Sequence, residues 1–260
     1  MAESAKKAVP VDPVKPIIQT PEGSGETIDL TELLEVGAHF GHQVRRWNPK
    51  MVKYIFTTRD NVHIIDLAKT ARNLEEAMAF VTKWVGEGND IVFVGTKRQA
   101  QAIVKEEAMK AGAPYVTERW LGGMISNWDE MQKRINKLKD LKQKRDSGAF
   151  NHYTKKERVL LDREIARLER FFGGIAHLPS RPQALFVVDT HKEVVAVKEA
   201  SIVGIPIVGM VDTNGDPDLV TYVIPINDDA VRAIKLTVTK IAEAYQRGLA
   251  LRKKEPSQLK

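Results

Sequence analysis

The sequence predicts a three-layer α/β domain, in which helices cover both faces of a parallel β-sheet. Short runs of apolar residues recur along the chain without polar alternation, as expected of strands that are buried on both faces. Most of these runs are followed by a helical pattern of roughly 10–15 residues, and strands that alternate with such helices form right-handed βαβ units. One long segment, residues 127–172, has no strand pattern, so we expect a helical hairpin inserted into the domain.

The strands and helices of the domain can be placed from the apolar pattern. A short helix at 31–35 comes first, with Asp29 or Thr31 as its N-cap and Gly37 at its end. The expected strands are 52–57, 62–65, 91–95, 115–116, 184–188, 206–211 and 222–226. The expected helices between and after them are 67–85, 97–111, 191–203 and 228–250.

The inserted segment contains two long helical stretches joined around residues 147–151. Each stretch has one narrow apolar stripe, with spacings of three and four residues, on an otherwise charged surface. The stripes consist of Trp128, Met131, Ile135 and Leu138 on the first helix, and of Leu161, Ile165, Leu168 and Phe172 on the second. Two such helices can bury their stripes against each other as an antiparallel coiled-coil hairpin that projects from the body. The alternative is two surface helices on the body, but the stripes are too narrow to face a sheet.

These patterns divide the chain into four parts. Residues 1–27 are rich in Pro, Ala, Gly, Ser and charge, and we expect a flexible N-terminal extension there. Residues 28–126 and 173–250 form the α/β body, 127–172 the hairpin, and 251–260 a basic C-terminal tail. Glycine pairs at 122–123 and 173–174 flank the hairpin and are expected to supply the tight turns where it leaves the body.

Composition excludes several classes of protein. The chain has no cysteine, which rules out disulfides, cysteine-based zinc sites and thiol catalysis and fits a reducing cytoplasm. Its longest uninterrupted apolar stretch, residues 202–211, is too short to span a bilayer. The N-terminus lacks the apolar segment of a secretory signal. We therefore expect a cytoplasmic protein that does not enter a membrane.

Positive charge gathers in three segments of the chain. The net charge is +6, but residues 39–59 hold five Lys and Arg with no acid, residues 131–170 hold thirteen against six acids, and residues 245–260 hold five against one. The remainder of the chain is therefore acidic overall. This distribution is typical of a protein that binds a polyanion such as RNA, although solvated charged faces are the alternative.

The segment 33–51 combines an arginine pair with Trp47 and two histidines, residue types suited to phosphate contacts and to stacking on unpaired bases. His39 and His42 can also be considered as metal ligands. Since the chain has no cysteine and no third ligand stands nearby in the sequence, histidines that are polar or contact RNA are the favoured interpretation.

This segment resembles the N-terminal signature of the small ribosomal subunit protein two family, in its bacterial form. Six further blocks resemble the same family in the same order, so the resemblance covers about residues 28–247. The seven blocks are 33–51, 54–67, 93–100, 119–128, 182–189, 205–214 and 224–230.

The resemblance implies a flavodoxin-like or Rossmann-like α/β body with a protruding coiled-coil hairpin. It also implies a structural, non-catalytic place in the cytoplasmic ribosome, on the solvent side of the small subunit where head meets body. The implied partners are small-subunit ribosomal RNA and neighbouring small-subunit proteins, including the large messenger-binding protein one. On this basis we expect no catalytic residue, no cofactor and no metal.

The basic residues divide into three sets of candidate RNA contacts. Near the body these are Arg45, Arg46, Lys50 and Lys53, with Trp47 either stacking on a base or supporting its loop. At or near the ends of strands they are Lys97, Arg98, Arg119 and Trp120. On the hairpin they are Lys133, Arg134, Lys137, Lys144, Arg145, Lys155 and Arg158, several of which we expect to be only solvated.

A nucleotide-binding enzyme of the Rossmann type is the main alternative, because α/β sheets often bind nucleotides. Residues 95–97 (Gly-Thr-Lys) follow a strand where a phosphate loop would lie, but they lack the spacing of a P-loop. Residues 189–191 and 212–214 also follow strands, and their polar groups suit helix caps and turns better than a ligand. A protein–protein scaffold without RNA is the second alternative, and the excess of Lys and Arg on the hairpin argues against it.

Overall fold

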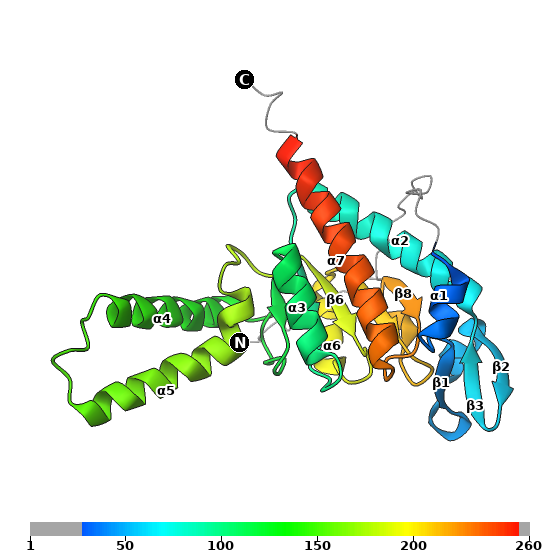
Figure 1. The fold of residues 1–260 in the computed structure, drawn as a ribbon, viewed down its shortest axis with the longest axis horizontal. Coiled ribbons are helices and arrows are strands. Elements are labelled where there is room, and N and C mark those ends of the chain that lie inside the picture. Colours follow the sequence, from blue (N-terminus) through cyan, green and yellow to red (C-terminus); the bar gives the residue numbers. More distant parts are fainter. Residues whose placement is uncertain (1–27, 255–260) are drawn as a thin grey trace, which may run out of the picture.

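The computed structural model describes residues 28–254 (Figure 1). The flexible extension expected at 1–27 lies outside these residues, as does most of the expected basic tail. The last helix continues to Lys254, so the tail contributes its first residues to that helix.

A five-stranded parallel sheet forms the centre of the body, with the strand order β5-β4-β6-β7-β8. Its strands are β4 (Ile91–Val94), β5 (Tyr115–Val116), β6 (Ala184–Val188), β7 (Ile207–Val211) and β8 (Tyr222–Pro225). Every residue of β4, β6 and β7 is buried, because helices cover both faces of the sheet. The predicted parallel α/β sheet is therefore confirmed.

Successive residues of each strand point to opposite faces and build two separate cores. On one face, Phe93 packs edge-on against Phe186 and Tyr245 beneath three long helices. On the other face, Val92 and Val187 pack against a shorter helix and the segment that leads into the hairpin. The first set of helices is α2 (Leu67–Gly86), α3 (Gln101–Ala111) and α7 (Val231–Lys254), and the shorter helix is α6 (Val194–Val203).

Three helices begin three residues or more after their predicted starts at 97, 191 and 228. The residues between strand and helix are turns at the edge of the sheet, where several polar side chains are buried, among them Lys97, Asp189 and Asp228. The apolar period does not reveal such turns, because they are built by polar contacts. This edge becomes the site described below.

A small antiparallel sheet adjoins β8 at one end of the body (Figure 1). It has the order β1-β3-β2 and follows the short helix α1, which Asp29 caps by accepting from the backbone N–H of Thr31 at 2.8 Å. The elements are α1 (Leu30–Glu35), β1 (Phe40–Gln43), β2 (Ile55–Arg59) and β3 (Val62–Ile65). The prediction of a strand at 52–57 is wrong in its first half, because a 3₁₀ helix, Pro49–Tyr54, occupies it. Asn48 caps this helix and Pro49 pre-sets its first turn.

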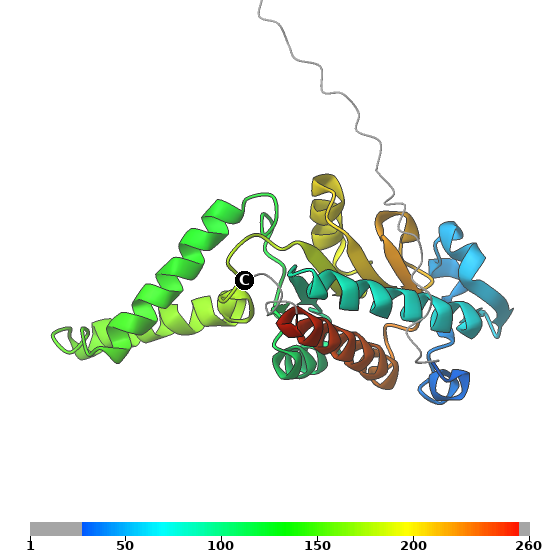
Figure 2. The ribbon, with the colours of Figure 1, turned by 90° about the horizontal axis from the view of Figure 1, so that it is seen from above.

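The inserted segment forms two helices, α4 (Trp128–Asp146) and α5 (Lys155–Phe172), which extend away from the body in both views (Figures 1 and 2). Ile135 of α4 and Ile165 of α5 are buried in one apolar cluster, which also contains residues of the body. Lys137 pairs with Glu164 across the hairpin at 3.0 Å. Thr154 and Glu157 form a capping box that fixes the start of α5.

Glycine is required at both ends of this insertion. Gly123 has a φ of +93°, which side chains rarely adopt. At Gly174 a Cβ atom would collide with the backbone oxygen of Tyr115 in β5, so the returning chain can pass this close only as glycine. These two positions let the chain leave the body and return to it.

Within residues 28–254, no helix combines the length and the apolar character that a membrane span requires.

We expect Ile135→Ala to loosen the hairpin without unfolding the sheet. Ile135 is 2 % exposed, and truncating such a residue costs about 2–5 kcal/mol. Amide hydrogen exchange should rise along α4 and α5 and stay unchanged in β4, β6 and β7. The neighbouring Asn136 is exposed, so Asn136→Ala should leave exchange at the level of the unaltered chain. Equal exchange in both variants would contradict this account of the hairpin.

Candidate functional site

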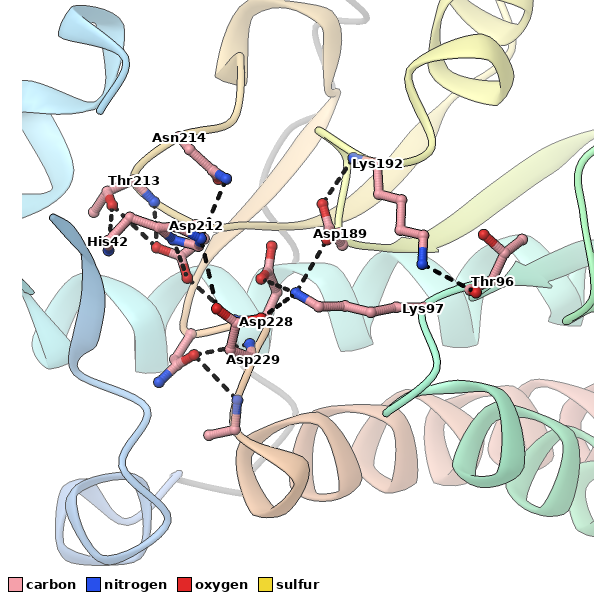
Figure 3. A network of polar contacts seen from close by, with 12 residues as sticks. His42, Thr96, Lys97, Asp189, Lys192, Asp212, Thr213, Asn214, Asp228 and Asp229 are labelled. Carbon is pink, nitrogen blue, oxygen red and sulfur yellow. Dashed lines mark hydrogen bonds and ion pairs between the residues drawn. The ribbon is translucent and has the colours of Figure 1, made fainter. Parts of the chain in front are cut away.

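Polar side chains meet at the carboxyl-terminal edge of the five-stranded sheet (Figure 3). Lys97 comes after β4, Asp189 after β6, Asp212 after β7, and Asp228 and Asp229 after β8. Because parallel strands end at the same edge, residues far apart in the sequence come together there. His42 joins them from β1 of the small sheet.

Lys97 is the buried cation of this edge cluster. Its Nζ atom lies 2.6 Å from Asp228 Oδ1, 2.7 Å from Asp229 Oδ1 and 3.1 Å from Asp189 Oδ2. Burial opposes its charge, but the carboxylates, Asp228 first, outweigh burial and raise the pKa of the Lys97 ammonium. An ammonium has three donors, and here all three face carboxylates of the same chain.

Lys97 was expected to contact RNA, but its burial and its ion pairs make it unsuited to bind a phosphate. It is 9 % exposed and its charge is already neutralised, so a phosphate can reach it only by displacing a carboxylate. The contacts of residues 95–97 also argue against the phosphate-binding loop that was considered there. There, the backbone N–H of Thr96 donates to the buried Glu193 carboxylate at 3.0 Å, in the place where a phosphate would accept.

Asp228 is one of the two most deeply buried acids of the cluster, and like Asp212 it is 1 % exposed. Burial, together with the carboxylates of Asp212 and Asp189, raises its pKa to about 8, although Lys97 acts in the opposite direction. Its Oδ1 atom contacts Lys97, whereas its Oδ2 atom is buried without a hydrogen-bond partner in the described chain. Such an atom is costly to bury and calls for a physical explanation.

His42 lies between two carboxylates. Its Nδ1 atom is 3.1 Å from Asp212 Oδ2, and its Nε2 atom is 3.5 Å from Asp229 Oδ2. Its backbone N–H donates to the hydroxyl of Thr213 at 2.8 Å, and a Cβ on the preceding Gly41 would collide with that threonine. The Asp212 carboxylate raises the pKa of His42 against the effect of burial. Strand β1 is thereby held directly against the turn after β7.

Polar groups at this edge, acids of the cluster included, also cap helices and turns, which is the role that the sequence favoured. Asp189 accepts from the backbone N–H of Lys192 at 2.8 Å, and Asp212 accepts from that of Thr213 at 2.5 Å. Asn227 accepts from two backbone N–H groups before α7.

The basic residues near the small sheet fall into two groups. Arg45, Arg46 and Lys53 are exposed, and none has a carboxylate partner within residues 28–254. Lys50 is exposed too, but its Nζ atom pairs with Asp216 at 2.8 Å and with Asp218 at 2.9 Å.

The two tryptophans among the candidates are not equally accessible. Trp47 is half-buried, and its ring lies 4.9 Å from that of His63, a contact that supports the loop. Trp120 is 6 % exposed in the core beside Met124 and Ile125, so it cannot stack on RNA without leaving the core. Its neighbour Arg119 is exposed, as is Arg98.

On the hairpin, about half of the candidates are paired with acids. Lys133, Lys137, Lys144 and Arg145 form ion pairs with Glu130, Glu164, Asp140 and Asp146. Arg134, Lys155 and Arg158 are exposed and have no ion pair within the described part of the chain. Among the predicted hairpin contacts, these three are the cations most available to an external phosphate.

Residues 33–248 match the family model described as ribosomal protein S2. The chain belongs to the ribosomal protein S2 family. It is 53 % identical over 227 residues to the protein named small ribosomal subunit protein uS2 of Roseiflexus sp. (strain RS-1), an alignment that covers 87 % of each chain. The family match includes both sheets, the hairpin and the cluster at the sheet edge.

The edge cluster was not predicted as a unit. Its acids stand in the segments 189–191, 212–214 and 227–229, directly after predicted strands, and this position is the signal that relates them. His42 could not be added, because β1 was not predicted and nothing in the local pattern places it beside β7.

Lys97→Met tests whether the cluster depends on its buried ammonium. Removing one partner of a buried ion pair costs about 3–5 kcal/mol, because the remaining carboxylates stay buried without their counter-charge. We expect urea denaturation to show a loss of this size. Arg98→Met, which alters the exposed neighbour, should change stability by less than about 0.5 kcal/mol. Similar unfolding midpoints for the two variants would be incompatible with the role given to Lys97.

Proposed function

We propose that this chain is a non-enzymatic, structural component of the small ribosomal subunit that binds ribosomal RNA and neighbouring proteins. The observation that supports the proposal most directly is the family match over residues 33–248, together with a relative named small ribosomal subunit protein uS2. Such a protein acts in translation, in the cytoplasm and as part of the ribosome.

RNA binding is proposed through two exposed basic surfaces. The first, the small-sheet surface, consists of Arg45, Arg46 and Lys53; the second, the hairpin surface, consists of Arg134, Lys155 and Arg158. Their guanidinium and ammonium groups are not neutralised by acids of the described chain, so each can exchange solvent counterions for RNA phosphates. Arg98 and Arg119, exposed on the body, are secondary candidates.

The small sheet and the hairpin, which carry these two surfaces, lie at opposite ends of the molecule along its longest axis (Figure 1). A protein that contacts RNA at both ends joins RNA segments that are far apart. This separation supports a location between head and body of the small subunit, where two parts of the particle meet. The large messenger-binding protein one is proposed as a protein neighbour from the family resemblance.

We also propose that α4 and α5 form a short antiparallel coiled coil. Residues at three- and four-residue spacing, among them Ile135 and Leu138 on α4 and Ile165 and Leu168 on α5, are buried on the facing sides of the hairpin. Such a hairpin is stiff enough to hold its basic residues at a fixed distance from the body.

Sedimentation of a tagged copy in a sucrose gradient tests the function as a whole. The tagged chain should migrate with small subunits and should remain with them when low magnesium separates the subunits. A chain that stays at the top of the gradient without ribosomal RNA would refute the proposal.

The double variant Arg45→Ala/Arg46→Ala tests the small-sheet surface. Each lost phosphate contact should reduce the slope of log affinity against log salt concentration by about 0.7–0.9, so the double variant should lose about 1.4–1.8. The measurement is filter binding to small-subunit ribosomal RNA at several salt concentrations.

Lys50→Ala is the matched control, because Lys50 lies on the same segment but is paired with Asp216 and Asp218. It should leave the salt slope nearly unchanged. A double variant with the slope of the unaltered chain would exclude Arg45 and Arg46 as phosphate contacts.

A further inference from the structure

Two exposed aromatic side chains lie next to each other at the tip of the hairpin. The tip is the turn between α4 and α5, and it lies at the end of the hairpin farthest from the body (Figures 1 and 2). His152 and Tyr153 form this tip ring pair, with ring centroids 4.3 Å apart and planes tilted by 33°. Both residues are exposed, and Tyr153 keeps 40 % of its surface accessible. A flat ligand can therefore reach the rings from solvent.

The tip ring pair is supported from inside the hairpin. Phe150 is 8 % exposed and belongs to the same apolar cluster as Ile135 and Ile165. Its ring meets that of Tyr153 edge to face, with the centroids 5.9 Å apart. This contact connects an exposed ring to the buried core of the hairpin. A ring that is already held in place loses less conformational freedom when a ligand stacks on it.

The backbone of the turn is fixed by its own hydrogen bonds. Helix α4 ends in a Schellman motif, in which the N–H of Ala149 donates to the carbonyl of Lys144 at 2.9 Å and Gly148 has a φ of +75°. Helix α5 begins at the capping box described above. Between these two ends, the N–H of Tyr153 donates to the carbonyl of Phe150 at 3.1 Å. The turn therefore presents its rings from a defined backbone.

Cations that are not neutralised follow the tip ring pair directly. Lys155, Lys156 and Arg158, in the first turn of α5, are exposed and form no ion pair within residues 28–254. The nearby acids are already bonded, since Asp146 pairs with the arginine before it and Glu157 belongs to the capping box. Exposed rings beside free cations are the combination that binds single-stranded nucleic acid, whose bases stack while its phosphates pair with the cations.

An apolar protein surface is the other ligand that could cover the rings. It would leave the three cations beside them without partners, so the charge favours RNA. Within RNA, the bases of a duplex are stacked on one another and cannot receive a protein ring, whereas the bases of loops, bulges and ends can. Charge and ring geometry together therefore favour an unpaired base.

We propose that the tip ring pair, His152 and Tyr153, stacks on an unpaired base of RNA, while Lys155, Lys156 and Arg158 bind the phosphates beside that base. The inference rests on the proposed function and makes it more specific. The hairpin then binds a single-stranded segment at its tip in addition to making phosphate contacts along its sides.

Tyr153→Leu tests the stacking, because leucine keeps an apolar side chain but has no flat ring. Binding is measured to small ribosomal subunits that lack their own copy of this chain, at several salt concentrations. We expect an affinity about 5–150-fold lower at every salt concentration, which is the range that one stacked base contributes. The slope of log affinity against log salt concentration should not change, because stacking releases no counterions. Tyr153→Trp, which keeps a flat ring, should bind as tightly as the unaltered chain.

Leu160→Ala is the matched control, because Leu160 is an exposed apolar residue of the same helix region without a ring. It should bind as tightly as the unaltered chain. An affinity loss equal to that of Tyr153→Leu would indicate an apolar protein contact and would overturn the proposal. The double variant Lys155→Ala/Lys156→Ala removes two phosphate contacts, so it should reduce the salt slope by about 1.4–1.8.

The same measurement separates this inference from the proposed function. If the unaltered chain binds the small subunits and Tyr153→Leu binds them equally well, the stacking is refuted and the proposed function stands. If the unaltered chain does not bind the small subunits at all, the proposed function fails and the stacking fails with it.

Ultraviolet cross-linking of the unaltered chain on the small subunit keeps the test valid even if a variant fails to fold. Irradiation joins a base to an aromatic ring that it contacts. Cleavage after Arg145 and Lys155 releases the peptide 146–155, which contains both tip rings. Mass spectrometry should find this peptide with a nucleotide attached. Nucleotides attached only to other peptides of the chain would contradict the stacking.

Discussion

The structure depends on covering both faces of a sheet whose central strands have no polar face. Residues of β4, β6 and β7 are buried on both sides, so apolar partners are needed above and below them. Helices α2, α3 and α7 supply one layer. The opposite layer is less regular, because α6 is short and the remainder comes from the segments that lead into and out of the hairpin, with Trp120 and Ile175 among them. The insertion therefore begins and ends inside the core, which keeps its base fixed.

Covering the faces leaves the carboxyl-terminal edge of the sheet as the place where polar groups gather. The chain must turn there after every strand, and turns favour Asp, Asn and Thr, which bond to the backbone. Several turns at one edge bring several carboxylates together, and their mutual repulsion then has to be offset. Lys97 offsets part of it through three carboxylates. The histidine from the small sheet, His42, contacts two more carboxylate oxygens. The packing of the small sheet against the large one therefore depends on the electrostatics of this edge.

The sequence was a good guide where apolar pattern decides the structure and a poor one where polar contacts decide it. Strands such as 184–188 were placed correctly, because five consecutive apolar residues predict a strand that is buried on both faces, as this one is. The start of α3 was misplaced, since residues 97–100 form a turn around the buried Lys97. Strand β1 was missed because its four residues, Phe-Gly-His-Gln, have no apolar run and are stabilised by long-range contacts to β3 and Thr213.

The candidate site shows the same division. Exposed cations such as Arg45 and Lys155 could be predicted, because the hairpin stripes and the charge runs indicate which side of a segment faces solvent. Trp120 and Lys97 could not be separated from them, since burial depends on contacts with residues far along the chain. Both stand beside exposed arginines, and a basic or aromatic neighbour of an arginine has the same appearance in a sequence whether it is buried or exposed.

The edge cluster also explains why an α/β body of this kind need not bind a nucleotide. In such folds a phosphate is held at the carboxyl-terminal edge by backbone N–H groups at the start of a helix. Here the corresponding N–H of Thr96 donates to Glu193, and Asp189 and Asp228 lie on either side of the neighbouring Lys97. A phosphate entering this edge would meet carboxylates of its own sign and would have to replace one of them. Positive charge that is free to meet phosphate lies instead on the small-sheet and hairpin surfaces, so the edge of the sheet is suited to cations and the two ends of the molecule to RNA.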